Sequence, residues 1–144
     1  MAYSQLELPE KFIYKTQMKV RVSDLNIANH LAYESMVAML SEGQMRFFSH
    51  FKIDQLNVEG LGLMVADLRV SYRSEAFYRD LLQFEVGIDN FNKYGCDIIF
   101  RVNNLNTGKL ASLARISVVA VDYVSRKIAL LPESFKINFL QPEH

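Results

Sequence analysis

Polar side chains that could carry out chemistry are concentrated in one short segment, Ser23 to His30, which reads SDLNIANH. Asp24 could attack a carbonyl carbon as a nucleophile or activate water as a general base. Three further side chains of the segment could orient that carboxylate or hold the carbonyl: Asn26, Asn29 and His30. Ser, Asp and Asn are also common in turns, because their side chains bond to nearby backbone groups. On its own, Asp24 therefore fits a capped turn as well as a catalytic site.

A helix is predicted directly after this segment, over residues 31–50, with Asn29 as its N-cap. An apolar stripe of helical period runs along it, formed by Met36, Leu40, Gly43 and Phe47. The opposite face is polar, with Ser35, Ser41, Glu42, Gln44 and Arg46. The width of the apolar arc predicts a helix largely enclosed by other structure. Its first turn would bring unpaired N–H groups and a partial positive charge beside Asp24, where they could stabilise an oxyanion.

Most of the remaining chain alternates between apolar and polar residues, as half-buried strands do. The alternation predicts strands over residues 12–22, 64–72, 82–89, 94–102 and 110–123, a loop over 54–62 and a short helical turn near 132–135. The connections after the helix are too short for crossover helices, so these strands should pair antiparallel. The predicted class is α+β, with one helix on one face of the sheet. One helix cannot cover five strands, so we expect a dimer formed through an edge or face.

Composition narrows the possible functions. The chain has 144 residues and its three prolines lie near the ends, which favours a single domain over residues 1–144. Lys and Arg total 16, as do Asp and Glu, so the net charge is zero. A nucleic-acid partner is therefore not expected, nor is an electrostatic membrane anchor. No apolar run approaches the roughly 18–20 residues of a membrane helix.

Several common site motifs are absent from the sequence. It contains no phosphate-binding loop, dinucleotide-binding glycine pattern, serine nucleophile elbow or zinc-protease helix motif. The one cysteine, Cys96, cannot form an intrachain disulfide, and no histidine and cysteine residues stand at zinc-ligand spacing. A cytoplasmic protein with no metal or redox cofactor is the simplest expectation.

The run VRVSDLNIANHLAYESMVAMLSEGQMRFF resembles the signature of hot-dog-fold acyl-CoA thioesterases of the 4-hydroxybenzoyl-CoA thioesterase-like superfamily. Members often have a strand, an S-D-x-x-x-x-x-H segment and a long central helix with an acidic residue near its middle. Asp24, His30 and Glu42 match that layout. A second match is ADLRVSYRSEAFYRDLLQFEVGI, with a strand, a turn that includes Phe77 and Asp80, and another strand. The likeness covers residues 15–135.

The resemblance implies an antiparallel sheet wrapped around one long central α-helix and the hydrolysis of an acyl-CoA by a homodimer or homotetramer. It implies that Asp24 is the nucleophile or general base. A backbone N–H at the start of the helix, close to Leu31, would polarise the thioester carbonyl, and His30 would contact the thioester or orient water. Asn26, Asn29 and Glu42 are candidate substrate contacts. The sequence departs from many relatives at Asn29, where they have Gly, and at Ala32-Tyr33, near which they have Asn.

Two other functions on the same fold stay open. A hydratase or dehydratase of acyl thioesters needs a histidine facing an acid. His30 and Glu42 are twelve residues apart, which is about 18 Å along a helix, so only a partner subunit could bring them together. A non-catalytic acyl-CoA-binding subunit would bind the ligand without turnover. Glu42 on the polar helix face also fits a solvated or interface carboxylate.

Overall fold

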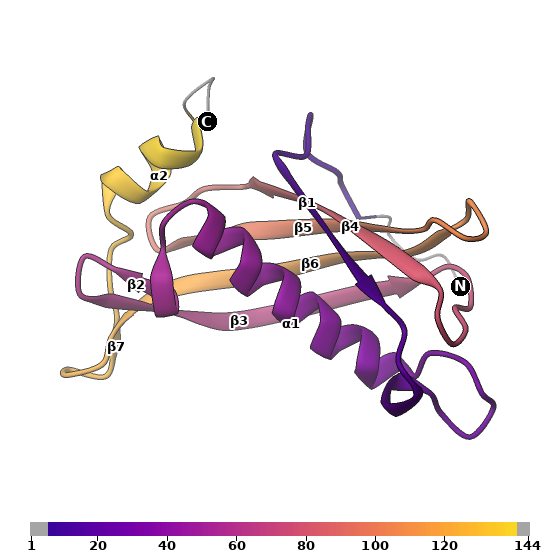
Figure 1. The fold of residues 1–144 in the computed structure, drawn as a ribbon. Helices are drawn as coiled ribbons and strands as arrows, with labels where there is room; N and C mark the ends of the chain where they lie inside the picture. Colours follow the sequence, from indigo (N-terminus) through magenta and orange to yellow (C-terminus); the bar gives the residue numbers. More distant parts are fainter. Residues whose placement is uncertain (1–5, 141–144) are drawn as a thin grey trace, which may run out of the picture.

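The computed structural model describes residues 6–140, and most of them belong to one antiparallel sheet and one long helix (Figure 1). The helical elements are η1 (Val22–Asp24), α1 (Tyr33–His50), η2 (Asp54–Leu56) and α2 (Glu133–Leu140). The strands are β1 (Tyr14–Lys19), β2 (Asn57–Val58), β3 (Leu61–Tyr72), β4 (Leu81–Asp89), β5 (Gly95–Asn104), β6 (Leu110–Asp122) and β7 (Lys127–Ile128). The region predicted as a loop, residues 54–62, contains η2 and β2, and α2 is longer than the predicted helical turn.

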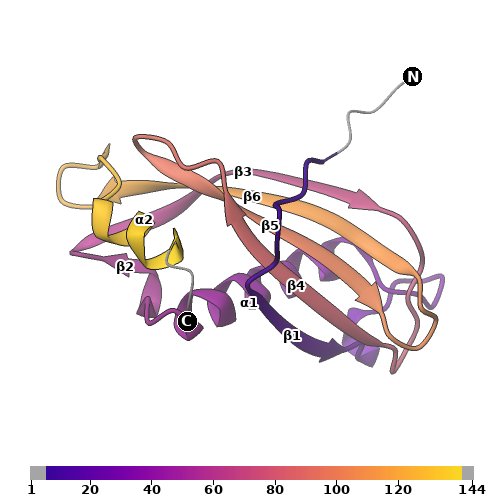
Figure 2. The same ribbon diagram turned by 90° about the horizontal axis from the view of Figure 1, so that it is seen from above.

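The strands are ordered β1-β4-β5-β6-β3-β2, and β7 pairs with β6 beyond this path. Every pairing is antiparallel, as the short connections predicted. The sheet is strongly twisted, and α1 runs diagonally across one of its faces (Figures 1 and 2). The predicted α+β arrangement is therefore confirmed.

The helix packs closely against the centre of the sheet. Leu40, Phe47 and Phe48 are fully buried, so the predicted apolar stripe faces the core. At Gly43, an added Cβ would lie 3.3 Å from Cε1 of Phe100, which is why a residue without a side chain suits this crossing. Gln44 is buried as well, at 4% exposure, so its predicted place on the polar face is wrong.

The start of α1 differs from the prediction. The helix begins at Tyr33, and its N-cap is Ala32, not Asn29. Asn29 instead has a φ of 66°, a left-handed conformation that asparagine adopts more readily than most residues. The Asn26 side chain accepts a hydrogen bond from the Ala28 N–H at 2.9 Å, which closes a turn ahead of the helix. The segment 26–30 is therefore a turn held by its own polar groups.

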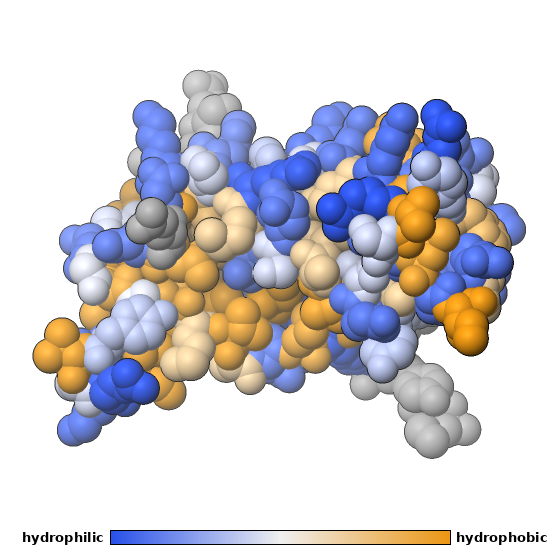
Figure 3. Space-filling view, turned by 60° about the horizontal axis from the view of Figure 1, so that its bottom comes forward, coloured by the Kyte–Doolittle hydropathy of each residue, from blue (hydrophilic) through white to orange (hydrophobic). Residues whose placement is uncertain are grey.

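Several apolar residues of β3 are about half exposed, among them Val65 at 49% and Tyr72 at 50%. On its outer edge, β3 pairs with β2 at only two positions, Leu61 and Gly62. Within the described part of the chain, the edge from residue 63 to 72 has no strand partner. Apolar side chains also gather along the side of the molecule shown in Figure 3.

Candidate active site

Asp24 is turned inward at the end of η1. Its side chain is 7% exposed, and both carboxylate oxygens are engaged by Arg21. The Arg21 backbone N–H donates to Oδ2 at 2.8 Å, and the guanidinium donates to Oδ2 at 3.3 Å and to Oδ1 at 3.2 Å. The Asp24 backbone oxygen accepts from the Ala32 N–H at 2.9 Å. These bonds fix the loop to the residue just before α1, and they raise the pKa of Arg21, chiefly through the side-chain hydrogen bond.

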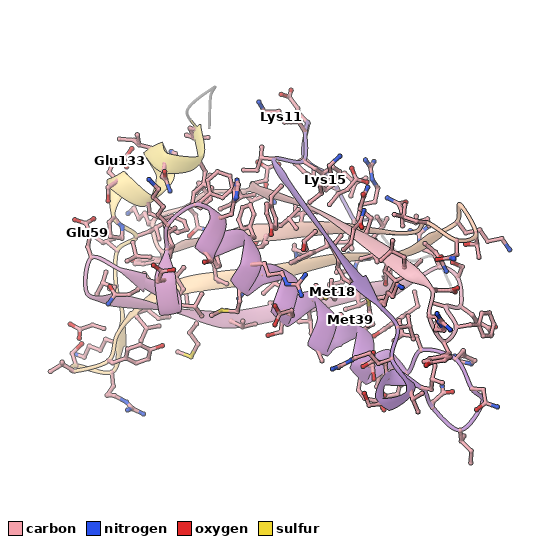
Figure 4. All side chains as sticks on the ribbon, in the orientation of Figure 1. Lys11, Lys15, Met18, Met39, Glu59 and Glu133 are labelled. Atoms are coloured by element: carbon pink, nitrogen blue, oxygen red, sulfur yellow. The ribbon has the colours of Figure 1, made fainter. Side chains whose placement is uncertain are left out.

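Asp24 lines a cavity of about 560 Å³ between β1 and α1, which we call the strand-side cavity. Its walls include Met18 of β1 and Met39 of α1, two side chains that lie between these elements in Figure 4. Glu42 also lines this cavity, and Arg46 holds its Oε2 through Nε at 2.7 Å. The other lining residues are Gln17, Lys19, Arg21, Ala38 and Arg46 itself. Asp24 thus shares a cavity with residues from the middle of α1.

His30 lies in a different hollow, at the N-terminal end of α1, which we call the helix-tip cavity. This cavity has a volume of about 360 Å³. Its lining residues are Asn26, His30, Leu31, Tyr33, Tyr72, Arg73, Ser74, Glu75 and Ala76. The segment after β3 forms one wall because the backbone of Phe77 bridges to that of His30. The cavity therefore brings residues 72–76 beside the turn that precedes the helix.

The imidazole of His30 is held on several sides. Its Nδ1 is 3.3 Å from the Leu31 carbonyl oxygen and 3.5 Å from Nδ2 of Asn26. Its Nε2 is 3.9 Å from Oε1 of Glu75, and its ring meets that of Phe77 edge-on at 6.4 Å. The imidazole is 27% exposed, so it can be reached from the cavity.

Free backbone donors stand at the same end of α1, but not at Leu31. The Leu31 N–H donates to the Ala76 oxygen at 2.8 Å, so the oxyanion donor expected close to Leu31 would have to be a neighbouring amide. The N–H groups of Ser35 and Met36 donate to Ala32. Across residues 6–140, no protein acceptor receives the N–H of Tyr33 or that of Glu34. These two amides are the unpaired donors that a helix N-terminus offers.

The sequence-predicted residues are thus divided between two cavities. Asp24 and Glu42 share the strand-side cavity, whereas Asn26, His30 and Leu31 share the helix-tip cavity. The side chain of Asn29 is exposed, and the residue lines neither cavity. Asp24 and Tyr33, the first residue of α1, therefore line different cavities.

Sequence reasoning missed two residues of the helix-tip cavity. Glu75 approaches His30 only because the turn after β3 folds back onto residues 30–31, and no local pattern signals such a contact. Tyr72 donates its hydroxyl to the Tyr33 carbonyl oxygen at 2.8 Å. Burial raises the pKa of Tyr72, with smaller contributions from Glu34 and Tyr33, so its hydroxyl stays protonated at neutral pH. In the sequence, the only hint was that position 72 is an aromatic residue with a hydroxyl group.

No group of three or more His, Cys, Asp and Glu side chains among residues 6–140 could hold a metal ion. Within the same residues, neither helix is long and apolar enough to span a membrane.

An antiparallel sheet curled around a single long helix, with cavities beside the loop that precedes the helix, defines a hot-dog-fold protein. Comparison with solved structures agrees. A 1,4-dihydroxy-2-naphthoyl-CoA thioesterase from Synechocystis superposes with a TM-score of 0.81 at 16% identity, over 91% of this chain and 98% of that one. A gentisyl-coenzyme A thioesterase superposes with a TM-score of 0.75 at 12% identity, over 89% and 100%. A Staphylococcus aureus protein in complex with CoA superposes with a TM-score of 0.76 at 18% identity, over 94% and 85%.

The model of the thioesterase-like superfamily matches residues 20–139, so the chain belongs to that superfamily. The matched region holds every candidate residue and all the residues that line the helix-tip cavity. Thioester hydrolysis is the chemistry of this class, as the resemblance implied. No curated protein matches the sequence.

Proposed function

We propose that the protein is an acyl-CoA thioesterase that hydrolyses its substrate to a free acid and coenzyme A in the helix-tip cavity. The observation that carries this assignment is the pair of unpaired N–H groups at Tyr33 and Glu34, the first residues of α1, beside a cavity that also holds His30. Membership of the thioesterase-like superfamily supports the reaction class. Two of the structural relatives are named as thioesterases of aryl-CoA compounds, and another is in complex with CoA.

The chemistry follows from what a helix N-terminus does to a carbonyl group. A thioester oxygen that accepts hydrogen bonds from the amides of Tyr33 and Glu34 becomes negatively charged when the carbonyl carbon is attacked. The amides and the helix dipole favour that charge more than the neutral ground state. Each such donor is worth about 2.7–4 kcal/mol in other hydrolases. The proposal needs no metal and no redox cofactor.

The contacts of Asp24 favour a supporting role. A carboxylate that accepts three hydrogen bonds from Arg21 has few lone pairs left for a reacting group. Asp24 also lines the strand-side cavity and not the helix-tip cavity. We therefore assign Asp24 to holding the loop in place. The prediction that it is the nucleophile or general base stays a prediction, which the Asp24→Asn variant tests directly.

The two alternatives fit the geometry less well. A hydratase built on His30 and Glu42 would need these groups to face each other, but within a protomer they line separate cavities. Water addition to crotonyl-CoA would reveal this activity. A non-catalytic binding subunit would bind acyl-CoA without turnover.

We also propose a homodimer in which the edges of β3 from two copies pair antiparallel. The edge from residue 63 to 72 offers backbone N–H and C=O groups, and its apolar side chains Val65 and Leu68 are exposed by 49% and 39%. A free and partly apolar edge of this length favours association with another strand. A second copy is the partner we favour, because antiparallel pairing of identical strands is closed and two-fold.

The experiment is a panel of acyl-CoA substrates that differ in chain length and aromaticity, with released thiol as the readout. We expect at least one substrate to be hydrolysed at a rate that saturates with concentration. No turnover of any substrate, together with tight acyl-CoA binding, would support the binding subunit and contradict the enzyme.

A further inference from the structure

His30 and Glu75 form a pair that faces the helix-tip cavity from two sides. His30 belongs to the turn before α1, and Glu75 belongs to the segment after β3. The distance from Nε2 to Oε1 is 3.9 Å, which is beyond a direct hydrogen bond but within reach of a shared water molecule. The backbone holds the two segments together, through the Leu31 N–H bonded to Ala76 and the bridge between His30 and Phe77. The pairing thus depends on the fold and not on a chance contact of two long side chains.

The contacts of His30 indicate which ring nitrogen is free. The Leu31 carbonyl oxygen can only accept a hydrogen bond, so its 3.3 Å contact requires a proton on Nδ1. Nδ2 of Asn26 can only donate and lies 3.5 Å from the same nitrogen, which would require the other tautomer; we assign the tautomer from the shorter contact. In the neutral imidazole, Nε2 then carries the lone pair. That lone pair is directed to the side where Glu75 lies.

We propose that His30 is the general base of thioester hydrolysis and that Glu75 is a positioning residue that orients the attacking water and stabilises the imidazolium. This inference rests on the proposed function. One hydrogen of the water bonds to Nε2 of His30 and the other to the Glu75 carboxylate. The carbonyl oxygen of the substrate accepts from the amides of Tyr33 and Glu34, the unpaired donors at the same end of α1.

The reaction then balances without a further reagent. As the water oxygen bonds to the carbonyl carbon, its proton passes to Nε2 of His30, and the carbonyl electron pair moves onto the oxygen. When the oxyanion collapses, the C–S bond breaks and the sulfur leaves with the electron pair. The imidazolium returns its proton to that sulfur, which releases the free acid and the thiol of coenzyme A.

The surroundings of the pair suit this role. The other titratable or charged side chains that line the cavity are Tyr33, Tyr72 and Arg73. Tyr72 is committed to the Tyr33 carbonyl, and Arg73 donates through Nε to the Ser71 hydroxyl at 2.8 Å. Glu75 has a side chain that is 64% exposed, and no guanidinium among residues 6–140 holds it as Arg21 holds Asp24. Among the residues that line the helix-tip cavity, Glu75 is therefore the carboxylate available to a reacting water.

The test compares His30→Asn and Glu75→Gln with the wild type, on whichever acyl-CoA the wild type hydrolyses. Asparagine can keep the donor that faces the Leu31 oxygen but has no basic nitrogen, and we expect kcat to fall by at least about 100-fold. For Glu75→Gln we expect kcat to fall about tenfold with KM unchanged, and Glu75→Asp should recover part of the loss. Glu10→Gln, an exposed glutamate outside the helix-tip cavity, is the matched control and should retain wild-type kcat.

The pH dependence separates a base from a structural residue. Wild-type kcat should decline as the pH falls below neutrality, because a protonated imidazole cannot accept the proton of water. His30→Asn should lose this decline in its residual activity.

Wild-type kcat in both His30→Asn and Glu75→Gln would overturn the proposed roles of this pair while leaving the thioesterase proposal intact. If His30→Asn does not fold, unchanged kcat in Glu75→Gln alone overturns the role of Glu75, and an unaltered pH profile in His30→Gln overturns that of His30. A wild type that hydrolyses no acyl-CoA would instead overturn the proposed function.

Discussion

At the scale of single residues, the role of a carboxylate depends on its tertiary contacts, as Asp24 and Glu75 show. Asp24 is the most conspicuous candidate in the sequence because it precedes a helix and has a family match. The structure gives both of its carboxylate oxygens to Arg21, three residues earlier. Glu75 has no motif around it, yet its carboxylate approaches His30 from the segment that follows β3. Residue type and spacing identified His30, but its partner depends on a tertiary contact.

Asp24→Asn tests the supporting role of this aspartate. Replacing the carboxylate removes the charge that holds Arg21, so the unfolding free energy should fall. Hydrolysis should stay within about tenfold of the wild type, since the helix-tip cavity keeps its own groups. Thermal unfolding and acyl-CoA hydrolysis measure the two effects. A loss of several orders of magnitude in kcat with unchanged stability would show that Asp24 is the catalytic carboxylate.

Glu85 gives the fold a pH dependence that is independent of the site. Its carboxylate accepts from Nε and Nη2 of Arg101, both at 2.9 Å, and from Asn103 at 2.7 Å. The hydrogen bonds from Arg101 lower the pKa of Glu85, followed by the opposing effect of burial and by smaller favourable contributions from Asn103 and Lys15. The ionised form is therefore favoured in the folded state. This stabilisation is present above the ordinary glutamate pKa and is lost as the pH falls through the lowered one.

We expect Glu85→Gln to lower the unfolding free energy by about 1 kcal/mol at neutral pH, after allowance for partial exposure of the pair. The difference from the wild type should shrink as the pH falls below about 4, where the wild-type carboxylate is protonated too. Urea unfolding at a series of pH values measures it. A difference that stays constant across this range would contradict the ionic origin.

At the scale of elements, α1 was predictable in its buried face but not in its start. The spacing of Met36, Leu40 and Phe47 indicated the buried stripe because such a helix must present one apolar side to the sheet. Gln44 was misplaced since residue polarity alone does not show which polar side chain a partner layer covers. The helix begins two residues later than predicted because Leu31 donates to Ala76 and Ala32 to Asp24. These tertiary bonds decide which amides remain free.

The unpaired edge of β3 leads to a prediction about assembly. Leu68→Glu should shift the protein from dimer to monomer, because two like charges would be brought together where the edges pair. Leu105→Glu, at an equally exposed leucine in the turn between β5 and β6, should leave the dimer unchanged. Light scattering after size-exclusion chromatography measures both masses. A Leu68→Glu variant of wild-type mass would exclude β3 as the dimer interface.

At the scale of the whole molecule, the arrangement of the sheet and the helix could be predicted from the sequence more fully than the site. Alternating strands, short connections and one wide apolar helix together predicted an antiparallel sheet around α1, and the solved relatives share that fold. The site was harder to predict because it is assembled from the turn before α1 and the segment after β3. His30 and Glu75, which belong to these two segments, are 45 residues apart in the sequence. The sequence does not show that the fold brings these two segments together beside one cavity. The cytoplasmic location stays a prediction.

The central claim is that the thioester carbonyl binds at the first turn of α1. A crystal structure with an acyl-CoA analogue in which a methylene group replaces the sulfur tests this most directly. We predict that the ketone oxygen lies about 2.7–3.1 Å from the amide nitrogen of Tyr33 or Glu34, with His30 beside the carbonyl carbon. A ketone bound in the strand-side cavity, next to Asp24 and Glu42, would contradict the account.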